Sequence, residues 1–301
     1  MQHLTAYLQS QNLDADLIKI LCSFADATEE IAHEIHFSDG SAAGTTNIYG
    51  EEQLALDIQA DQIMEKHFRS SEVVYKLASE ERENCEILNE NGEYSVAYDP
   101  LDGSSLVNVN FAVGSILAIF KDKDFIGKSP REMKGTAFTV YGPRTTIVLS
   151  IGTGTHEFTL CEGKFILTRE NLKIQETAKN FAPGNLKACK TEKWYKELVD
   201  QWIMNGYKLR YSGGMVPDIN HILIKGQGIF AYPSTDKEPD GKLRLLIECG
   251  PMAYLIENAG GEAYDGKIKI LDKKIEKIDQ RTPIFIGSKE EVEKIIKVKN
   301  K

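Results

Sequence analysis

The sequence predicts an α/β (α+β) protein of stacked layers, divided into two tightly joined lobes. Its 301 residues reach the length at which one compact unit starts to divide. Apolar spacing changes along the chain from that of helices to that of short strands, and the last third mixes both patterns. A polar stretch that ends in Pro183-Gly184 separates the two regions. We therefore place the lobe boundary near residue 172, which gives lobes of 1–171 and 172–301.

The amino-terminal lobe is expected to contain helices followed by antiparallel hairpins. Apolar residues at helical spacing predict one or two amphipathic helices in the first 35 residues and another over 53–68. The segments 142–144 and 162–163 have the composition of hairpin turns. Short runs rich in β-branched or aromatic residues predict strands at 94–98, 115–120, 136–141, 145–151, 157–161 and 164–168.

The carboxyl-terminal lobe is expected to mix helices with strands in stacked layers. Trp194, Leu198 and Trp202 fall on one face of a predicted helix, and a second helix is expected near 243–258. Strands are predicted at 208–211, 221–225, 228–232 and 283–287.

Composition argues against several partners and locations. The formal net charge of −9 opposes long contacts with nucleic acid or anionic lipid, because such binders normally present a basic face. The five cysteines are scattered, odd in number and without a Cys-x-x-Cys pair, which argues against a disulfide framework or a zinc knuckle. The sequence shows neither a secretory signal nor a long apolar run. We therefore expect a cytoplasmic protein that binds neither nucleic acid nor membranes.

Residues 94–105, YSVAYDPLDGSS, combine a strand with closely spaced acidic groups. The alternating pattern predicts a half-buried strand that delivers Asp99 at its end. Pro100 cannot continue the strand ladder, which leaves the carbonyl group of Leu101 free to face the same way as Asp99 and Asp102. Two carboxylates and a carbonyl group are hard oxygen donors, which suit Mg²⁺ or Mn²⁺ better than zinc.

The next residues and two upstream segments extend this acidic group. Gly103-Ser104-Ser105 offers consecutive backbone N–H groups and hydroxyls, as in an anion-binding nest. Asp57 is expected near the start of a helix, and Glu80-Glu81 follow an apolar run. Each acidic residue alone could be a solvated surface carboxylate, and a capping turn would explain the proline and the glycine. However, two carboxylates about 4 Å apart repel by roughly 4 kcal/mol at an effective dielectric constant near 20, so a cluster needs divalent counter-ions.

Five segments resemble class 1 fructose-1,6-bisphosphatases, in the same order and with similar spacing over roughly residues 15–290. The sequences DPLDGSS and GKLRLLIECGPMAYLIENAGG are the most specific of them. The five segments are Leu56-Asp57, Ser79-Glu80-Glu81, Asp99 to Ser105, Leu209 to Asp218 and Gly241 to Gly261.

The resemblance implies a Mg²⁺-dependent sugar bisphosphatase with a layered α/β/α/β/α sandwich, assembled as a homotetramer. It implies two or three Mg²⁺ ions per subunit, with Mn²⁺ as the alternative, and a role in gluconeogenesis. The implied metal ligands are Glu80, Asp99, the carbonyl group of Leu101, Asp102 and Glu248.

The resemblance also assigns the remaining site residues. Asp57 and Glu81 would orient and deprotonate the attacking water. The 1-phosphate would lie on Asp102, Gly103, Ser104 and Ser105. Sugar and 6-phosphate contacts would come from Tyr211, Tyr232 and Lys242, from Asn185 and Lys187, and from Arg210 of a neighbouring subunit.

Two departures leave the substrate open. Leu106 follows DPLDGSS where the best-known fructose enzymes carry asparagine, and PGNL at 183–186 is more similar to sedoheptulose-1,7-bisphosphatases. The alternatives are therefore a sedoheptulose-1,7-bisphosphatase or a bifunctional enzyme. An inositol-phosphate or nucleotide phosphatase and a non-catalytic sugar-phosphate sensor are further alternatives, although the sensor would be expected to lack a catalytic carboxylate.

Overall fold

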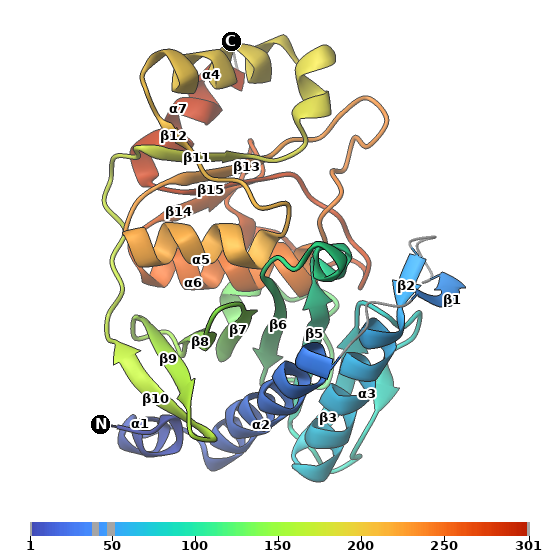
Figure 1. Cartoon of the computed structure of the whole chain (residues 1–301). Helices are drawn as coiled ribbons and strands as arrows, with labels where there is room; N and C mark the ends of the chain where they lie inside the picture. Colours follow the sequence, from blue (N-terminus) through green and yellow to red (C-terminus); the bar gives the residue numbers. More distant parts are fainter. Residues whose placement is uncertain (1, 38–41, 47–51, 300–301) are drawn as a thin grey trace.

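The protein forms two main β-sheets and the helices that cover them, as a computed structural model of the chain shows (Figure 1). The structure describes residues 2–37, 42–46 and 52–299. The larger sheet has eight strands in the order β10-β9-β8-β7-β6-β5-β3-β4, and the smaller has five in the order β12-β11-β13-β15-β14. A separate two-stranded sheet joins β1 (Ala42–Thr46) to β2 (Glu52–Leu54).

The strands of the larger sheet are mostly antiparallel neighbours in sequence, whereas β3 and β5 run parallel. These strands are β3 (Val74–Ser79), β4 (Glu86–Ile87), β5 (Tyr94–Asp102), β6 (Val113–Phe120), β7 (Gly135–Tyr141), β8 (Thr145–Ser150), β9 (Thr155–Cys161) and β10 (Lys164–Arg169). The smaller sheet consists of β11 (Asn180–Pro183), β12 (Lys208–Leu209), β13 (Ile229–Tyr232), β14 (Glu262–Tyr264) and β15 (Ile284–Gly287).

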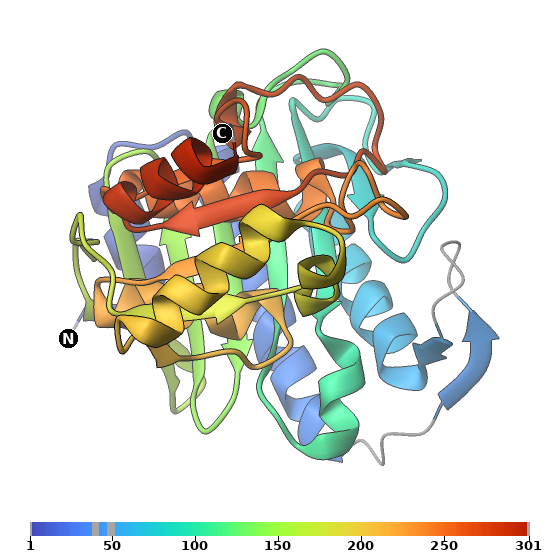
Figure 2. The ribbon, with the colours of Figure 1, turned by 90° about the horizontal axis from the view of Figure 1, so that it is seen from above.

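Helices form three layers around the two sheets, so the predicted α/β/α/β/α sandwich is confirmed (Figures 1 and 2). One outer layer contains α1 (Leu4–Ser10), α2 (Ala15–Phe37) and α3 (Ala55–Ser70). Between the sheets lie α5 (Met215–Lys225) and α6 (Gly250–Asn258). The other outer layer contains α4 (Lys193–Met204) and α7 (Lys289–Lys299).

The layering explains why the expectation of a half-buried strand at 94–98 is wrong. All nine residues of β5 are buried, because each face of the larger sheet is covered by helices. Val96 and Tyr98 pack in the core beneath α2 and α3, whereas Ala97 packs in the core that includes α5 and α6. An alternating pattern indicates one polar face only if the small residues between the aromatic ones face water.

The prediction of a strand at 221–225 is also wrong, because these residues form the last turns of α5. Met215, Val216, Ile219, Ile222 and Leu223 are buried in this helix at the spacing of one helical face. The helix ends at Gly226, whose φ of 65° lies in the left-handed region that favours glycine.

The helix expected near 243–258 is present in two parts. A π-helical turn, η4 (Leu245–Cys249), precedes α6. The predictions did not include β3, β4, β11, β14 or α7. Four of these elements contain four residues or fewer or have only partial burial, so their sequence patterns are weak.

Candidate active site

A cavity of about 570 Å³ opens where strands of the larger sheet end beside the second half of the chain. It is lined by residues of α3, of the turn after β3, of β5, and of segments around 211–215 and 242–248. Segments far apart in sequence thus form one site. Among the predicted site residues, the following line the cavity: Asp57, Glu80, Glu81, Asp99, Leu101, Asp102, Gly103, Ser104, Ser105, Tyr211, Tyr232, Lys242 and Glu248.

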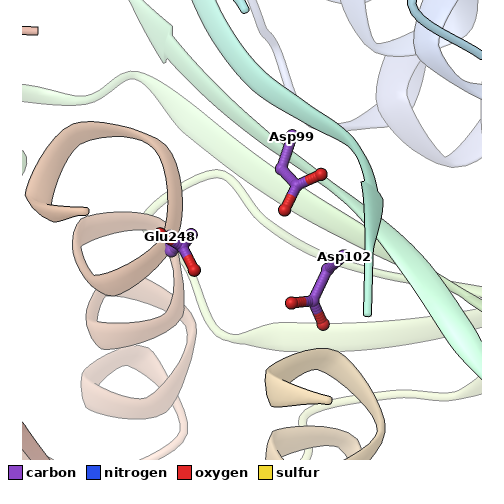
Figure 3. A group of neighbouring side chains, drawn as sticks. All are labelled: Asp99, Asp102 and Glu248. Atoms are coloured by element: carbon purple, nitrogen blue, oxygen red, sulfur yellow. The ribbon is translucent and has the colours of Figure 1, made fainter. Parts of the chain in front are cut away.

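The acidic residues that line the cavity form what we call the acidic wall: Asp57, Glu80, Glu81, Asp99, Asp102 and Glu248. Three buried carboxylates form its centre (Figure 3). Asp99 and Asp102 come from the end of β5, and Glu248 comes from η4. One oxygen atom from each lies within 4.8 Å of the others, and the exposed fractions of the three residues are 3%, 8% and 5%. This spacing and this donor set fit a cation that prefers oxygen ligands.

An irregularity in the strand ladder directs both aspartates to the cavity. The register between β5 and β6 shifts between Asp99 and Asp102, so the ladder is interrupted at Pro100 and resumes opposite Gly114. The backbone N–H of Leu101 donates to Asp99 Oδ1 at 2.8 Å, which fixes that carboxylate against its own turn. Pro100 therefore interrupts the pairing as predicted, but it does not end the strand.

Burial and mutual repulsion raise the proton affinity of this centre. Burial, then the charges of Glu80, Asp102 and Glu248, raises the pKa of Asp99 well above its ordinary value. Burial raises the pKa of Asp102 to about 8, although the N–H of Val216 donates to its Oδ2 at 2.7 Å. Burial likewise raises the pKa of Glu248 to about 7, against the opposing charge of Arg244. The positive charge near these three carboxyl groups is therefore too small to keep their pKa values in the ordinary range.

Arg244 is a member of this wall that the sequence analysis did not select. Its guanidinium group forms an ion pair with Glu80 and lies 3.5 Å from Glu248 Oε2, and its side chain is only 6% exposed. Its backbone N–H also donates to Glu248 Oε2 at 2.6 Å. The sequence signal was the spacing of four residues between Arg244 and Glu248 within KLRLLIE, a separation typical of ion pairs on a helix.

The other acidic residues surround this centre. Asp57 lies in the first turn of α3 and is 3% exposed. Glu80 and Glu81 follow β3. The backbone N–H of Glu81 donates to Ser79 Oγ at 3.2 Å, which restrains this residue. The backbone N–H of Glu80 donates to the carbonyl group of Tyr98 at 3.1 Å. The turn that carries both glutamates is thus fastened to β3 and β5.

The turn after Asp102 forms the floor beside the acidic wall. Gly103 has a φ of 77°, and a short 3₁₀ helix, η1 (Ser104–Val109), starts directly after it. The first N–H groups of such a helix have no partner within the helix and are available to an anion. Leu106 lies over Gly213 and Gly214, where an added methyl group on either glycine would come within 3.3 to 3.5 Å of its side chain.

A second part of the lining is more open. The side chain of Tyr211 is 44% exposed, Lys242 is exposed, and Tyr232 is partly buried at the end of β13. These residues add two phenol groups and one ammonium group to the lining of the cavity. Such an arrangement can hold a polyhydroxylated ligand with an anionic end.

Three predicted substrate contacts lie outside the residues that line this cavity. The side-chain amide of Asn185 donates to the carbonyl group of Pro233 at 2.9 Å, which ties the turn before η3 (Leu186–Lys190) to the end of β13. Lys187 is exposed on η3. Arg210 is exposed after β12 and donates from Nη1 to the carbonyl group of Leu209 at 2.7 Å.

The fold and the site together define an α/β sandwich protein whose cavity combines a carboxylate group suited to a cation with the turn at Gly103. Comparison with known families gives two matches that follow each other along the chain: the fructose-1-6-bisphosphatase N-terminal domain over residues 3–170 and its C-terminal domain over 174–300. The chain therefore belongs to the class 1 fructose-1,6-bisphosphatase family, whose members are phosphoric monoester hydrolases, and both predictions are confirmed.

Individual relatives carry the same resemblance. A class 1 fructose-1,6-bisphosphatase of Geotalea uraniireducens is 47% identical over 292 residues, which cover 96% of this chain and 93% of that protein. A chloroplastic sedoheptulose-1,7-bisphosphatase of Triticum aestivum is 39% identical over 96% of this chain and 74% of that protein. The holo form of Leishmania major fructose-1,6-bisphosphatase superposes with a TM-score of 0.95 at 31% identity, covering 100% of this chain and 99% of that one.

Among the described residues, no helix has the length and apolarity that crossing a membrane would require.

Proposed function

We propose that this protein hydrolyses the 1-phosphate of fructose-1,6-bisphosphate, giving fructose 6-phosphate and inorganic phosphate. The observation that carries the proposal is the buried group Asp99, Asp102 and Glu248 directly beside the Gly103 turn in one cavity. Carboxylates suited to a cation next to free N–H groups form a site for a phosphate ester. The tyrosines and Lys242 in the same lining would bind a sugar with a second phosphate.

The acidic wall fits Mg²⁺, with Mn²⁺ as the alternative, and we propose two or three ions per subunit. The proposed ligands are Glu80, Asp99, the carbonyl group of Leu101, Asp102 and Glu248. The three buried carboxyl groups have raised pKa values even though Arg244 lies beside Glu80 and Glu248, so added positive charge would stabilise their ionised forms. When bound, Mg²⁺ would supply charge stabilisation for the phosphate oxygens and would make a coordinated water more acidic.

The side chains of this protein would perform the remaining steps. Glu81 and Asp57 line the cavity, so we propose that they orient the attacking water and accept its proton. The N–H groups and hydroxyls of 103–105 would hold the 1-phosphate in line with that water. Tyr211, Tyr232 and Lys242 would bind the sugar and its far phosphate.

Further contacts are proposed beyond the cavity. Asn185 and Lys187 would extend the binding of the 6-phosphate along the turn before η3. Arg210 would act on the active site of a neighbouring subunit in a homotetramer. Support for this arrangement comes from the exposed apolar side chain of the neighbouring Leu209, which is 56% exposed.

The division of labour follows the chain. We propose that residues 1–171 act as the metal-binding and catalytic lobe and residues 172–301 as the sugar-phosphate lobe, within a cytoplasmic enzyme of gluconeogenesis. All five cysteines are free thiols, which supports a reducing compartment.

A second candidate substrate is sedoheptulose-1,7-bisphosphate. The observation that favours it is Leu106, an apolar side chain packed on the Gly213-Gly214 turn next to Tyr211. The side chain of Leu106 cannot form a hydrogen bond with a substrate. We propose that a substrate one carbon longer would depend less on contacts near the Gly213-Gly214 turn.

Initial rates of phosphate release test these proposals directly. Purified protein with Mg²⁺ would be assayed on the six-carbon and seven-carbon bisphosphates, with inositol monophosphate and a nucleotide monophosphate as controls. We expect kcat/KM for fructose-1,6-bisphosphate to exceed that for both controls, and Glu81→Gln to abolish most of the rate. Release of no phosphate from any sugar bisphosphate would refute the proposed function.

A further inference from the structure

A charged network lies beneath the acidic wall and includes none of its proposed ligands. Its centre is Arg82, whose side chain is 22% exposed. The guanidinium group donates from Nε to Asp61 Oδ2 at 2.7 Å, from Nη2 to Glu65 Oε2 at 2.7 Å and from Nη1 to Glu86 Oε2 at 2.6 Å. One cation therefore joins three carboxylates from α3 and β4.

Tyr98 completes the network from the strand side. It is fully buried in β5, and its hydroxyl donates to Asp61 Oδ1 at 2.9 Å. Asp61 is thus held by Tyr98 through one oxygen and by Arg82 through the other. A buried carboxylate with both oxygens occupied has a single orientation, and it fixes its two donors relative to each other.

Each part of this network is adjacent to a carboxylate of the cavity. Arg82 directly follows Glu80-Glu81, Tyr98 directly precedes Asp99, and Asp61 lies one helical turn after Asp57 on α3. The three elements that bring acidic groups from the first half of the chain to the cavity are therefore connected to one another at their neighbouring residues.

We propose that Arg82, Asp61 and Tyr98 are positioning residues that set the spacing of the acidic wall before a cation binds. Without them, mutual repulsion would favour separation of the turn at 80–81 from α3 and β5. The planar guanidinium group suits this role because its donors point in fixed directions toward several carboxylates, which a lysine ammonium group cannot reproduce. The inference rests on the proposed cation site.

The test measures Mn²⁺ binding to the purified protein without substrate, by electron paramagnetic resonance of the free ion. We expect Arg82→Lys, which keeps the charge, and Tyr98→Phe, which removes one hydroxyl, to weaken Mn²⁺ binding by about 10-fold to 100-fold. Because both act through Asp61, the double variant should lose less than the product of the two single losses. In activity assays, the same variants should raise the Mg²⁺ concentration for half-maximal rate and leave KM for the sugar nearly unchanged.

Arg69→Gln is the matched control. Arg69 also donates to Glu65, at 2.6 Å, and pairs with Glu86, but its hydrogen bonds do not include Asp61. Its side chain is 45% exposed, so we expect Mn²⁺ affinity within about twofold of the unsubstituted protein. Urea unfolding of each metal-free variant shows whether lost affinity merely follows lost stability.

Wild-type Mn²⁺ affinity in Arg82→Lys and Tyr98→Phe would overturn the inference. A loss in Arg69→Gln equal to theirs, or no Mn²⁺ binding by the unsubstituted protein, would overturn it as well. Normal Mn²⁺ binding without release of phosphate from a sugar bisphosphate would contradict only the proposed function, so the two failures are distinguishable.

Discussion

The two walls of the cavity differ in how much of their structure exists before a ligand arrives. On the acidic wall, Asp57 and Asp99 are each 3% exposed, and their neighbours are fixed by hydrogen bonds. In the second part of the lining, which we propose binds the sugar and call the sugar wall, Tyr211 is 44% exposed and Lys242 is exposed. The acidic wall is therefore buried and held by hydrogen bonds, whereas the sugar wall is open to solvent.

This difference separates two functions that one cavity must combine. Crowded carboxylates are costly to bury, so the surrounding structure must hold them in place and supply countercharge. A sugar-binding wall has to admit and release its ligand, and exposed side chains permit that. Substitutions in the acidic wall should therefore change catalysis and stability, and substitutions in the sugar wall should change substrate affinity.

The largest effect is expected for Asp102→Asn. The amide keeps the size of the side chain and an oxygen to accept the N–H of Val216, but it removes one negative charge from the proposed cation site. We expect the activation free energy to rise by about 4 kcal/mol, so that kcat falls roughly a thousandfold, because charge stabilisation in the site is lost. Steady-state rates at saturating Mg²⁺ would measure this, with circular dichroism to verify folding. A fall in kcat smaller than tenfold would contradict a catalytic role for Asp102.

The next effect is expected for Arg244→Met, which tests the need for countercharge. Methionine fills part of the volume but leaves Glu80 and Glu248 without their buried guanidinium partner. We expect the metal-free protein to lose about 3 kcal/mol in free energy of unfolding, since breaking a buried ion pair leaves a charge unopposed. Urea unfolding would measure it, and added Mg²⁺ should restore part of the loss. A stability loss unaffected by Mg²⁺ would show that Arg244 supports packing alone.

A change in the sugar wall should have a different signature. For Lys242→Met we expect KM for fructose-1,6-bisphosphate to rise roughly 30-fold, which corresponds to about 2 kcal/mol of binding free energy, because a charged contact to phosphate is lost. The same substitution should leave the stability of the protein unchanged and affect Mn²⁺ affinity far less than KM, because the charge of Lys242 acts on the pKa of Glu248 less than that of Arg244 does. An equal fall in kcat at unchanged KM would contradict the separation of the two walls.

The smallest effect concerns the pH dependence of the metal-free protein. An unfolded carboxyl group releases its proton near pH 4, whereas Asp102 retains it to about pH 8 and Glu248 to about pH 7. Between those values the folded state binds more protons than the unfolded state, so the free energy of unfolding falls as the pH rises.

Differential scanning calorimetry from pH 5 to 9 would measure this effect. We expect Tm to fall across this range and Mg²⁺ to reverse the fall increasingly as the pH rises. A Tm that rises across this range would contradict the proposed shortage of positive charge.

The same contrast describes what could be predicted from the sequence. Most of the acidic residues that line the cavity could be selected from the sequence, because DPLDGSS places Asp99, Asp102 and the Gly103 turn within one short segment. Arg244 was missed because its role depends on Glu80, which lies 164 residues earlier in the chain. The network around Arg82 was missed for the same reason: a run of charged residues after Glu80 is equally typical of a solvated loop.

Predictions of the fold failed where long-range packing overrode local pattern. The apolar residues at 221–225 suit a strand in isolation, but with Met215 and Ile219 they complete the buried face of α5. The strand at 94–98 was located correctly, and only the burial of its second face depended on helices contributed by the other half of the chain.

The most direct test of the central claim is ³¹P nuclear magnetic resonance of fructose-1,6-bisphosphate during incubation with the protein and Mg²⁺. The account predicts that the 1-phosphate signal disappears while that of the 6-phosphate remains, and that chelation of Mg²⁺ stops the reaction. Loss of the 6-phosphate first, or an unchanged rate after chelation, would contradict it.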